Sequence, residues 1–431
     1  MRILIYSYNY HPEPIGIAPL MTELAEGLVK QGHQVRVITG MPNYPQREIY
    51  EEYRGKWYVT EQKNGVTIQR SYLRIRSKPN LVDRLLLELS FVFTSLPQAL
   101  NGWRPDVILL TVPPLLVSLP ATLLGWLYNC PVILNVQDIL PEAGVRVGLI
   151  KNKWMIRALE AVEQFAYRSA HTISVIADGF VENLVNKGVP EQKIVCIPNW
   201  VNVNFICPLP KKSNPFRNAY QLDNKFVVLY SGNIALTQGL ETVIEAATSL
   251  RHIPEIVFVI AGEKRALKRL QADCQARGAS NILLLPLVER EKLPELLAAA
   301  DVSLVVQKRN VISFNMPSKI PLELASGRPI IASVPASGTA ARAVRKSGGG
   351  IVVAPESPEA LADAIMDLYA NPAKAAKLGH QGRQFAVERY SFEQALAEYE
   401  ALFAEVIATS SESPSLRMLP KLTSSESIID I

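Results

Sequence analysis

Short apolar runs that alternate with helical patterns constrain the fold of this 431-residue chain more than any other feature. The opening run RILIYSYNY is followed by a Pro/Gly loop and by a helical stripe made of Ile17, Leu20, Met21, Leu24 and Leu28. Gly32 ends this helix and QVRVIT follows as a strand, and the same order recurs at VILLTV, PVILNVQD, HTISVIA and KIVCIPN. This alternation predicts parallel strands joined by right-handed helical crossovers.

A break in composition divides the chain. Residues 202–225 hold three prolines and no periodic pattern, which predicts a linker, and the strand–helix pattern restarts at FVVLYSG. Because the chain exceeds what one hydrophobic core usually supports, we expect an α/β protein with two doubly wound domains that face each other across a cleft. The predicted boundaries are 1–199 and 200–388, then a helix at 389–407 that packs back toward the first domain, and a disordered tail at 408–431.

The apolar stretch from Val107 to Leu134 is long enough in principle to cross a bilayer. Three prolines interrupt it, and a buried strand–helix–strand unit has the same hydropathy. We favour the second interpretation. The formal net charge of +5 is scattered and predicts no nucleic-acid partner. Four separated cysteines without a C-x-x-C pair, and no signal-peptide n-region, fit a reducing cytoplasm.

Ligands of such sheets bind beyond the carboxyl ends of the strands, so the residues there are the candidates. In the first half, Gly16 precedes a helix whose free N–H groups suit an anion. The alternative is a glycine that only forms the turn. Asp138 and Glu142 follow the strand PVILNV and face the expected cleft, but Asp138 is equally suited to capping the turn.

The second half offers a denser set of candidates. Two cations emerge together after the strand DVSLVV, at Lys308 and Arg309. The strand FVVLYS ends in a loop that opens a helix on which a diphosphate can rest, and its candidate residues are Gly232, Asn233, Gln238 and Gly239.

Ser318 is a good N-cap for a helix that starts near Lys319, and Glu323 lies four residues further on the same face. A carboxylate accepts hydrogen bonds from two ribose hydroxyls, and cations neutralise a pyrophosphate leaving group. These residues therefore fit a nucleotide-diphosphate sugar. The alternative is an ordinary surface ion pair between Lys319 and Glu323.

Residues 68–84 carry Arg70, Arg74, Arg76, Lys78 and Arg84 against one acid, Asp83, and the apolar helix LLLELSFVF follows. A basic stretch beside exposed apolar residues suits an anionic membrane surface. A solvated β-hairpin edge next to a core helix explains the same pattern equally well.

Together these motifs resemble the retaining glycosyltransferases of family four, which have the GT-B fold of two Rossmann-like domains. The nearer resemblance is to bacterial exopolysaccharide transferases of the colanic-acid fucosyltransferase type. The shared stretches are YNYHPEPIGI, GHQVRVITGMPNYPQ, VQD–PE, IPNW, LYSGNI–QGLETVIEAA, LVVQKR and MPSK.

The resemblance implies an N-terminal acceptor domain, a C-terminal domain that binds the donor, and retention of anomeric configuration without a metal or cofactor. The family's E-x7-E signature maps onto Asn315 and Glu323, so its first carboxylate is replaced by an amide. The family's phosphate motif loses both of its cations here, and Lys308, Arg309 and Lys319 are our candidates to supply that charge. We take Asp138, Glu142 and Asn315 as the candidate catalytic residues.

The sequence therefore predicts a hexosyltransferase at the inner face of the cytoplasmic membrane. It moves a sugar from a nucleotide-diphosphate donor to a saccharide acceptor that is linked to a lipid. Two alternatives stay open. One is a sugar-nucleotide epimerase of the same fold, which the five dispersed histidines disfavour. The other is a non-catalytic membrane-associated scaffold, suggested by the altered motif positions.

Overall fold

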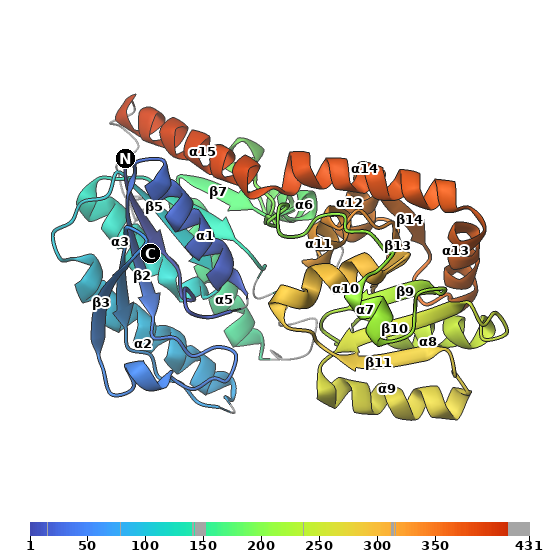
Figure 1. Ribbon diagram of the computed structural model, residues 1–431. Coiled ribbons are helices and arrows are strands. Elements are labelled where there is room, and N and C mark those ends of the chain that lie inside the picture. Colours follow the sequence, from blue (N-terminus) through green and yellow to red (C-terminus); the bar gives the residue numbers. More distant parts are fainter. Residues whose placement is uncertain are drawn as a thin grey trace, which may run out of the picture. The chain divides into compact units, whose positions relative to one another are not determined.

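The computed structural model describes residues 1–14, 16–77, 79–139, 142, 152–235, 237–311, 314 and 316–412. The chain divides into two compact units (Figure 1). The first unit holds the described residues of Met1–Pro141, Ile150–Ile173 and Tyr399–Ile431, and the second holds those of Glu142–Leu149 and Ser174–Glu398. Each contains a largely parallel sheet with helices on it, so the predicted α/β class with two Rossmann-like domains is confirmed.

The first sheet has eight strands in the order β3-β4-β2-β1-β5-β6-β7-β8. β1 lies between β2 and β5 and is parallel to both, whereas β3 pairs antiparallel with β4. Every residue of β5 and β6 is buried, which explains why both read as continuous apolar runs. The strands are β1 (Arg2–Tyr6), β2 (Gln34–Gly40), β3 (Tyr58–Lys63), β4 (Val66–Ser71), β5 (Val107–Val112), β6 (Val132–Val136), β7 (Thr172–Val175) and β8 (Ile194–Cys196).

The apolar stretch 107–134 forms a strand–helix–strand unit, as we favoured. It consists of β5, the 3-10 turn η2 (Leu115–Val117), helix α3 (Ser118–Tyr128) and β6. Within the described residues, no helix combines the length and the apolarity needed to cross a bilayer.

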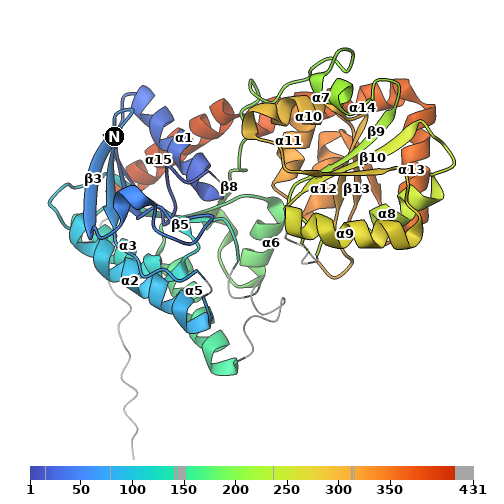
Figure 2. The same cartoon turned by 60° about the horizontal axis from the view of Figure 1, so that its bottom comes forward.

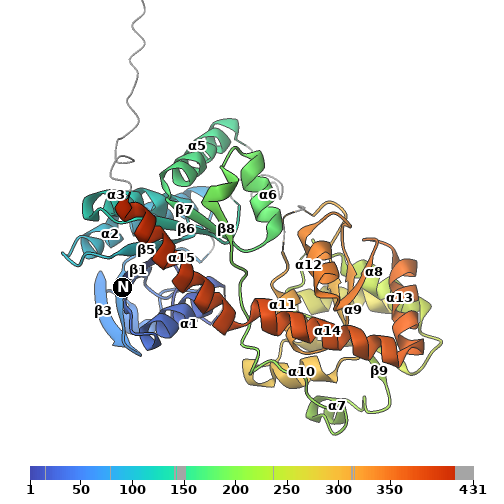
Figure 3. The same cartoon turned by 90° about the horizontal axis from the view of Figure 1, so that it is seen from above.

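Helices cover both faces of the first sheet. Figure 3 shows α1 and α15 on one face and α2 and α3 on the other. α2 begins with a capping box in which Asn80 and Asp83 satisfy each other's backbone N–H groups. The remaining helical segments of this part of the chain are α1 (Ile17–Lys30), η1 (Glu51–Tyr53), α2 (Leu81–Ala99), α5 (Lys153–Ser169), α6 (Asp178–Asn186) and η3 (Glu191–Lys193).

The last helix, α15 (Phe392–Glu412), returns to the first unit from Tyr399 onward. The Tyr399 hydroxyl accepts a hydrogen bond from the Asn135 side chain at 2.9 Å, and Glu400 pairs with His33 at 2.9 Å. The helix continues to Glu412, into the segment expected to be a disordered tail, and residues 413–431 lie outside the described ones.

The second sheet has six strands in the order β11-β10-β9-β12-β13-β14, and every neighbouring pair is parallel. Alternate residues of β9 face two separate cores: Val227 and Leu229 belong to one, and Val228 and Tyr230 to the other. The strands are β9 (Phe226–Ser231), β10 (Ile256–Gly262), β11 (Ile282–Pro286), β12 (Val302–Val306), β13 (Ile330–Ser333) and β14 (Gly350–Val353).

The helices of the second unit divide between these two cores. Residues of α10, α11, α12 and α14 line the core of Val227 and Leu229, and residues of α8, α9 and α13 line the other. The helical segments are α7 (Pro215–Ala219), α8 (Leu240–Ser249), α9 (Lys264–Arg277), η4 (Arg290–Lys292), α10 (Leu293–Ala299), α11 (Lys319–Ala325), α12 (Thr339–Ser347), α13 (Pro358–Ala370) and α14 (Pro372–Tyr390).

The linker predicted at residues 202–225 is wrong. Val203, Ile206 and Phe216 are buried in the core of the second unit. Arg217 is also buried, and its guanidinium donates to the Ala299 carbonyl and pairs with Asp301. The segment lacks a period because it is largely irregular, yet its side chains still fill the core.

Candidate active site

Helix α11 starts at Lys319, as predicted, but Ser318 does not cap it with its side chain. The backbone of Ser318 has φ −60° and ψ −17°, which is helical rather than the extended conformation of a capping serine. Ser318 is exposed directly before the helix.

Lys319 and Glu323 are not a surface ion pair. The Lys319 ammonium lies 3.5 Å from the centroid of the Tyr230 ring, it is screened from solvent, and it has no hydrogen-bond partner. Glu323 is 1% exposed, and its Oε2 atom also has no partner. A buried polar group without a partner costs about 1–3 kcal/mol. A bound ligand that supplies the missing hydrogen-bond partners would remove this cost, so two such groups on one helical turn indicate a ligand-binding site.

Burial also shifts the titration of this pair. Desolvation raises the pKa of the Glu323 carboxyl, and the nearby Ser303 hydroxyl and Lys319 ammonium act against it. Desolvation lowers the pKa of Lys319, and the charge of Glu323 acts against that change. Each charge is therefore costly by itself and is partly stabilised by the other.

The loop between β9 and α8 lies beside these two residues. Gly232 has φ 131°, and a Cβ atom at this position would stand 3.6 Å from Lys319 Cε. The hydroxyl of Tyr230, whose ring contacts Lys319, donates to the Asn233 carbonyl at 2.6 Å. The structure therefore brings Gly232, Asn233, Lys319 and Glu323 into one neighbourhood.

A second cation stands at the start of α8. Gly239 is the N-cap of this helix and has a left-handed backbone with φ 65°. A Cβ atom there would lie 3.0 Å from Lys308 Cγ, so Lys308 packs against the helix N-terminus. The Lys308 amide donates to the Thr237 carbonyl at 2.9 Å, which fixes the strand end to this loop. Positive charge is thus added where the helix dipole is already positive.

Two further candidates are less firmly placed. The Arg309 amide donates to Glu356 at 3.0 Å, and the residue is exposed. Gln238 is half-buried, and its amide donates to the Ala235 carbonyl at 3.0 Å. No hydrogen bond or ion pair between described residues links either side chain to Lys319 or Glu323.

In the first unit, Gly16 is the N-cap of α1 with φ 72°, and a Cβ atom would meet nothing within 4 Å. The helix therefore begins in open space, with a backbone conformation that favours glycine. Asp138 is exposed, and its Oδ1 atom accepts a hydrogen bond from the amide of the next residue, Ile139, at 2.9 Å. Desolvation by the surrounding protein raises its pKa.

Glu142 is held by helix α6. Its Oε2 atom accepts from the Asn183 side chain at 3.0 Å and lies 3.7 Å from Lys187 Nζ. This carboxylate is therefore already engaged within the second unit. Asn315, the third candidate catalytic residue, lies outside the described residues.

Sequence reasoning missed Glu13, which is 4% exposed. Its carboxylate accepts from the backbone amides of Asn43 and Tyr44 at 2.8 and 2.9 Å and from the Asn9 side chain at 2.6 Å. Burial raises its pKa, and these hydrogen bonds oppose the shift. Glu13 therefore ties the loop after β1 to the loop after β2. The signals were its place in the loop after the first strand and in the shared stretch YNYHPEPIGI.

The basic stretch 68–84 does not form a continuous cationic surface. Arg70 is completely buried; its guanidinium pairs with Glu61 and donates to the His11 carbonyl at 2.6 Å. Arg76 pairs with Asp83 at 3.3 Å, and Lys78 lies outside the described residues. Arg70 cannot contact a lipid headgroup, so this part of the prediction is wrong.

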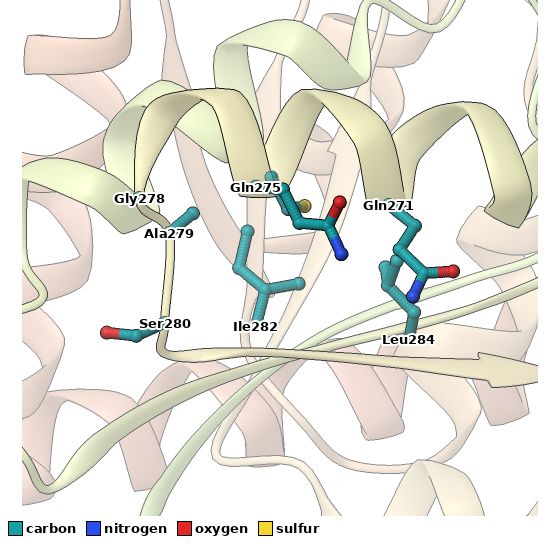
Figure 4. Close-up of a pocket in the computed structure, with 8 residues that line it drawn as sticks. Gln271, Gln275, Gly278, Ala279, Ser280, Ile282 and Leu284 are labelled. Atoms are coloured by element: carbon teal, nitrogen blue, oxygen red, sulfur yellow. The ribbon is translucent and has the colours of Figure 1, made fainter.

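A pocket elsewhere in the second unit is unrelated to these residues. Figure 4 shows it between α9 and the edge strand β11, lined by residues such as Gln271, Gln275 and Ile282. None of its lining residues is charged. It therefore offers no charged side chain to a phosphate.

Comparison with known proteins identifies the class. The Glycosyl transferase 4-like domain matches residues 16–200, and the Glycosyl transferases group 1 domain matches residues 213–385. The chain belongs to this family of glycosyltransferases and has the GT-B fold expected from the resemblance.

A putative colanic acid biosynthesis glycosyl transferase of Escherichia coli K12 is 33% identical, over 93% of this chain and 98% of that protein. Two solved structures share the fold. Sucrose-phosphate synthase of Thermosynechococcus elongatus superposes with a TM-score of 0.71 at 18% identity, covering 95% of this chain and all of that one. Anabaena HepE in complex with UDP superposes with a TM-score of 0.70 at 14% identity, and the match covers 94% of this chain and all of the HepE chain.

Proposed function

We propose that this glycosyltransferase moves a hexosyl residue from a nucleotide-diphosphate sugar to a lipid-linked saccharide, with retention of configuration and without a metal. Its membership of a family active in exopolysaccharide and glycan synthesis supports the general reaction. The similarity to HepE, which was solved with UDP, supports a nucleotide diphosphate as the leaving group.

The buried pair of Lys319 and Glu323 carries this proposal. Glu323 Oε2 has no hydrogen-bond partner among the described residues, so it can accept hydrogen bonds from the ribose hydroxyls of a donor. The Lys319 ammonium also lacks a hydrogen-bond partner, so it can donate to a phosphate oxygen beside Gly232. Binding would satisfy both groups and would remove the cost of leaving them unpaired.

Leaving-group stabilisation is proposed to come from the start of α8. The free N–H groups of this helix and the Lys308 ammonium both provide positive charge, which suits a pyrophosphate that gains charge as the sugar leaves. Such a site can neutralise the leaving group with the protein's own groups. We propose that Arg309, Gln238 and Asn315 complete the contacts to the donor.

Binding of nucleoside diphosphates tests this assignment. Calorimetry of the purified protein with UDP, GDP, ADP and dTDP should find at least one that binds. Glu323→Gln should weaken that binding about tenfold to a hundredfold, since a hydrogen bond to a charged group is worth about 1.5–3 kcal/mol. The matched control is Glu245→Gln, which alters an exposed carboxylate of α8 paired with Arg277 at 2.7 Å. If a folded Glu323→Gln variant binds like wild type, the assignment is wrong.

The stereochemistry needs a separate measurement. With a donor of known anomeric configuration and a soluble acceptor analogue, proton NMR of the first-formed product should show the donor's configuration. A product of inverted configuration would contradict the proposal of retention.

A further inference from the structure

Helix α3 has an outward face without a single polar residue. Its exposed positions are Leu119, Leu123, Trp126 and Leu127, spaced so that they form one stripe, and the helix contains no charged residue. A helix on the surface of a globular domain normally turns charged and polar residues outward. The outward face of α3 therefore needs a partner.

The two helices that contact α3 extend this surface. α2 and α5 both pack against α3, and Figure 2 shows all three on one side of the first unit. Phe93 of α2 is 71% exposed and Trp154 of α5 is 77% exposed. More than half of the exposed large apolar side chains among the described residues lie on these three helices, which we call the three-helix face; they are Val82, Leu85, Phe93, Leu119, Leu123, Trp126, Leu127, Trp154 and Phe165.

The charges around the three-helix face are mostly positive. Its exposed charged residues are four bases and one acid, namely Arg84, Lys153, Arg157, Arg168 and Glu160. The Arg157 guanidinium lies over the Trp154 ring, 5.6 Å from its centroid. Apolar and aromatic side chains bordered by basic groups match the interface of a bilayer that contains anionic lipids.

We infer that the three-helix face docks the protein on an anionic lipid bilayer, with Leu123 and Trp126 of α3 entering the boundary between headgroups and acyl chains. This rests on the proposed function, because it provides access to a lipid-linked acceptor. It overlaps the segment 68–84 only at the start of α2, where Val82 and Arg84 lie, because Arg70 of that segment is buried. Most of the exposed apolar side chains come from α3, α5 and the rest of α2. The proposed contact is interfacial, because the exposed apolar side chains lie along the sides of the three helices.

A vesicle flotation experiment with the full chain tests this inference. The probes are vesicles of phosphatidylcholine alone and of phosphatidylcholine with phosphatidylglycerol. Wild type should float with the mixed vesicles, and Leu123→Ser/Trp126→Ser should bind them at least tenfold more weakly. The matched control is Trp57→Ser/Leu287→Ser, which removes an exposed tryptophan and leucine from outside the three-helix face and should bind like wild type.

Salt and fluorescence separate insertion from simple charge attraction. Screening by 1 M salt should weaken wild-type binding by less than the Leu123→Ser/Trp126→Ser change does. Lipids brominated on their acyl chains should quench tryptophan fluorescence, and Trp126→Phe should lose much of the quenching. This measurement on wild type tests the inference even if the double variant fails to fold. If the brominated lipids do not quench the tryptophan fluorescence of wild type, the inference is overturned.

A different partner on the three-helix face would give different results in these experiments. If wild type does not float but forms dimers that the double variant cannot form, a second copy covers the face and the inference is overturned. Hydrolysis of the donor in the same preparations keeps the two proposals apart. Hydrolysis without vesicle binding overturns this inference alone, whereas binding through α3 without any transfer or hydrolysis overturns the proposed function alone.

Discussion

Replacing Lys319 and Glu323 together by methionine should stabilise the protein while it abolishes binding of the donor. Glu323 is buried and the Lys319 ammonium is screened from solvent, and neither this ammonium nor Glu323 Oε2 has a hydrogen-bond partner among the described residues. Desolvation raises the pKa of Glu323 and lowers the pKa of Lys319, so it favours the neutral form of each group. Methionine has nearly the same length and no charge, so the double change keeps the packing and removes the desolvation cost. The proposed donor site uses both charges, which accounts for their position inside the protein despite the cost.

The magnitude follows from the arrangement. Two unpaired polar atoms cost about 1–3 kcal/mol each, and exchanging a buried ion pair for apolar groups is neutral or stabilising by about 1–4 kcal/mol. We therefore expect the double variant to be about 1–4 kcal/mol more stable. For a domain of this size, each kcal/mol raises Tm by about 2–4 °C. Either single change leaves one buried charge without its partner and should destabilise by up to about 3–5 kcal/mol.

The assay is urea unfolding at pH 7 of wild type, the two single variants and the double variant, with nucleoside diphosphate binding measured in parallel. Arg277→Met/Glu245→Met is the matched control, because it removes an exposed ion pair and should change stability by less than about 1 kcal/mol. A double variant that is clearly less stable than wild type, or that still binds the nucleotide, would refute this reasoning.

Three further outcomes are expected. Gly239→Ala and its control Gly278→Ala should each lower the free energy of unfolding in urea by about 1–2 kcal/mol, because both glycines have a left-handed backbone. Only Gly239→Ala should also weaken nucleotide binding, because its Cβ atom would press on Lys308, whereas a Cβ atom at Gly278 meets nothing within 4 Å. Burial raises the pKa of Glu88 from the usual value of 4.5 to about 7. Between these two pH values the folded state keeps a proton that the unfolded state has released, so the stability of wild type should fall as pH rises from about 4.5 to about 7. Glu88→Gln should lack this decline, which thermal unfolding at pH 5 and pH 8 would detect as a stabilisation confined to the higher pH. Sugar transfer should persist in EDTA; loss of activity that magnesium or manganese restores would contradict the metal-free proposal.

Much of the fold could be predicted because its strands are buried on both faces. VILLTV and PVILNV read as apolar runs since β5 and β6 are fully enclosed. The amphipathic stripe after Gly16 forms α1 (Ile17–Lys30), which ends two residues before the predicted stop at Gly32. The linker prediction for residues 202–225 was wrong because an irregular backbone can still place side chains such as Phe216 in a core.

The site could be predicted only in part. The spacing of Lys319 and Glu323 is the same for an exposed pair and for a buried one, and only the tertiary structure shows that both are enclosed near Tyr230. Arg70 shows the same limit, because a basic residue expected on the surface is completely buried in strand β4. Periodicity places residues on elements, but it does not show what packs over them.

The return of α15 to the first unit has a consequence for biosynthesis. Because Tyr399 and Glu400 contact Asn135 and His33, the unit that begins at residue 1 is complete only when nearly the whole chain has left the ribosome. The second unit, by contrast, can finish its sheet earlier, once β14 has emerged. A nascent chain that has emerged only to about residue 390 would therefore carry a first unit with this side uncovered.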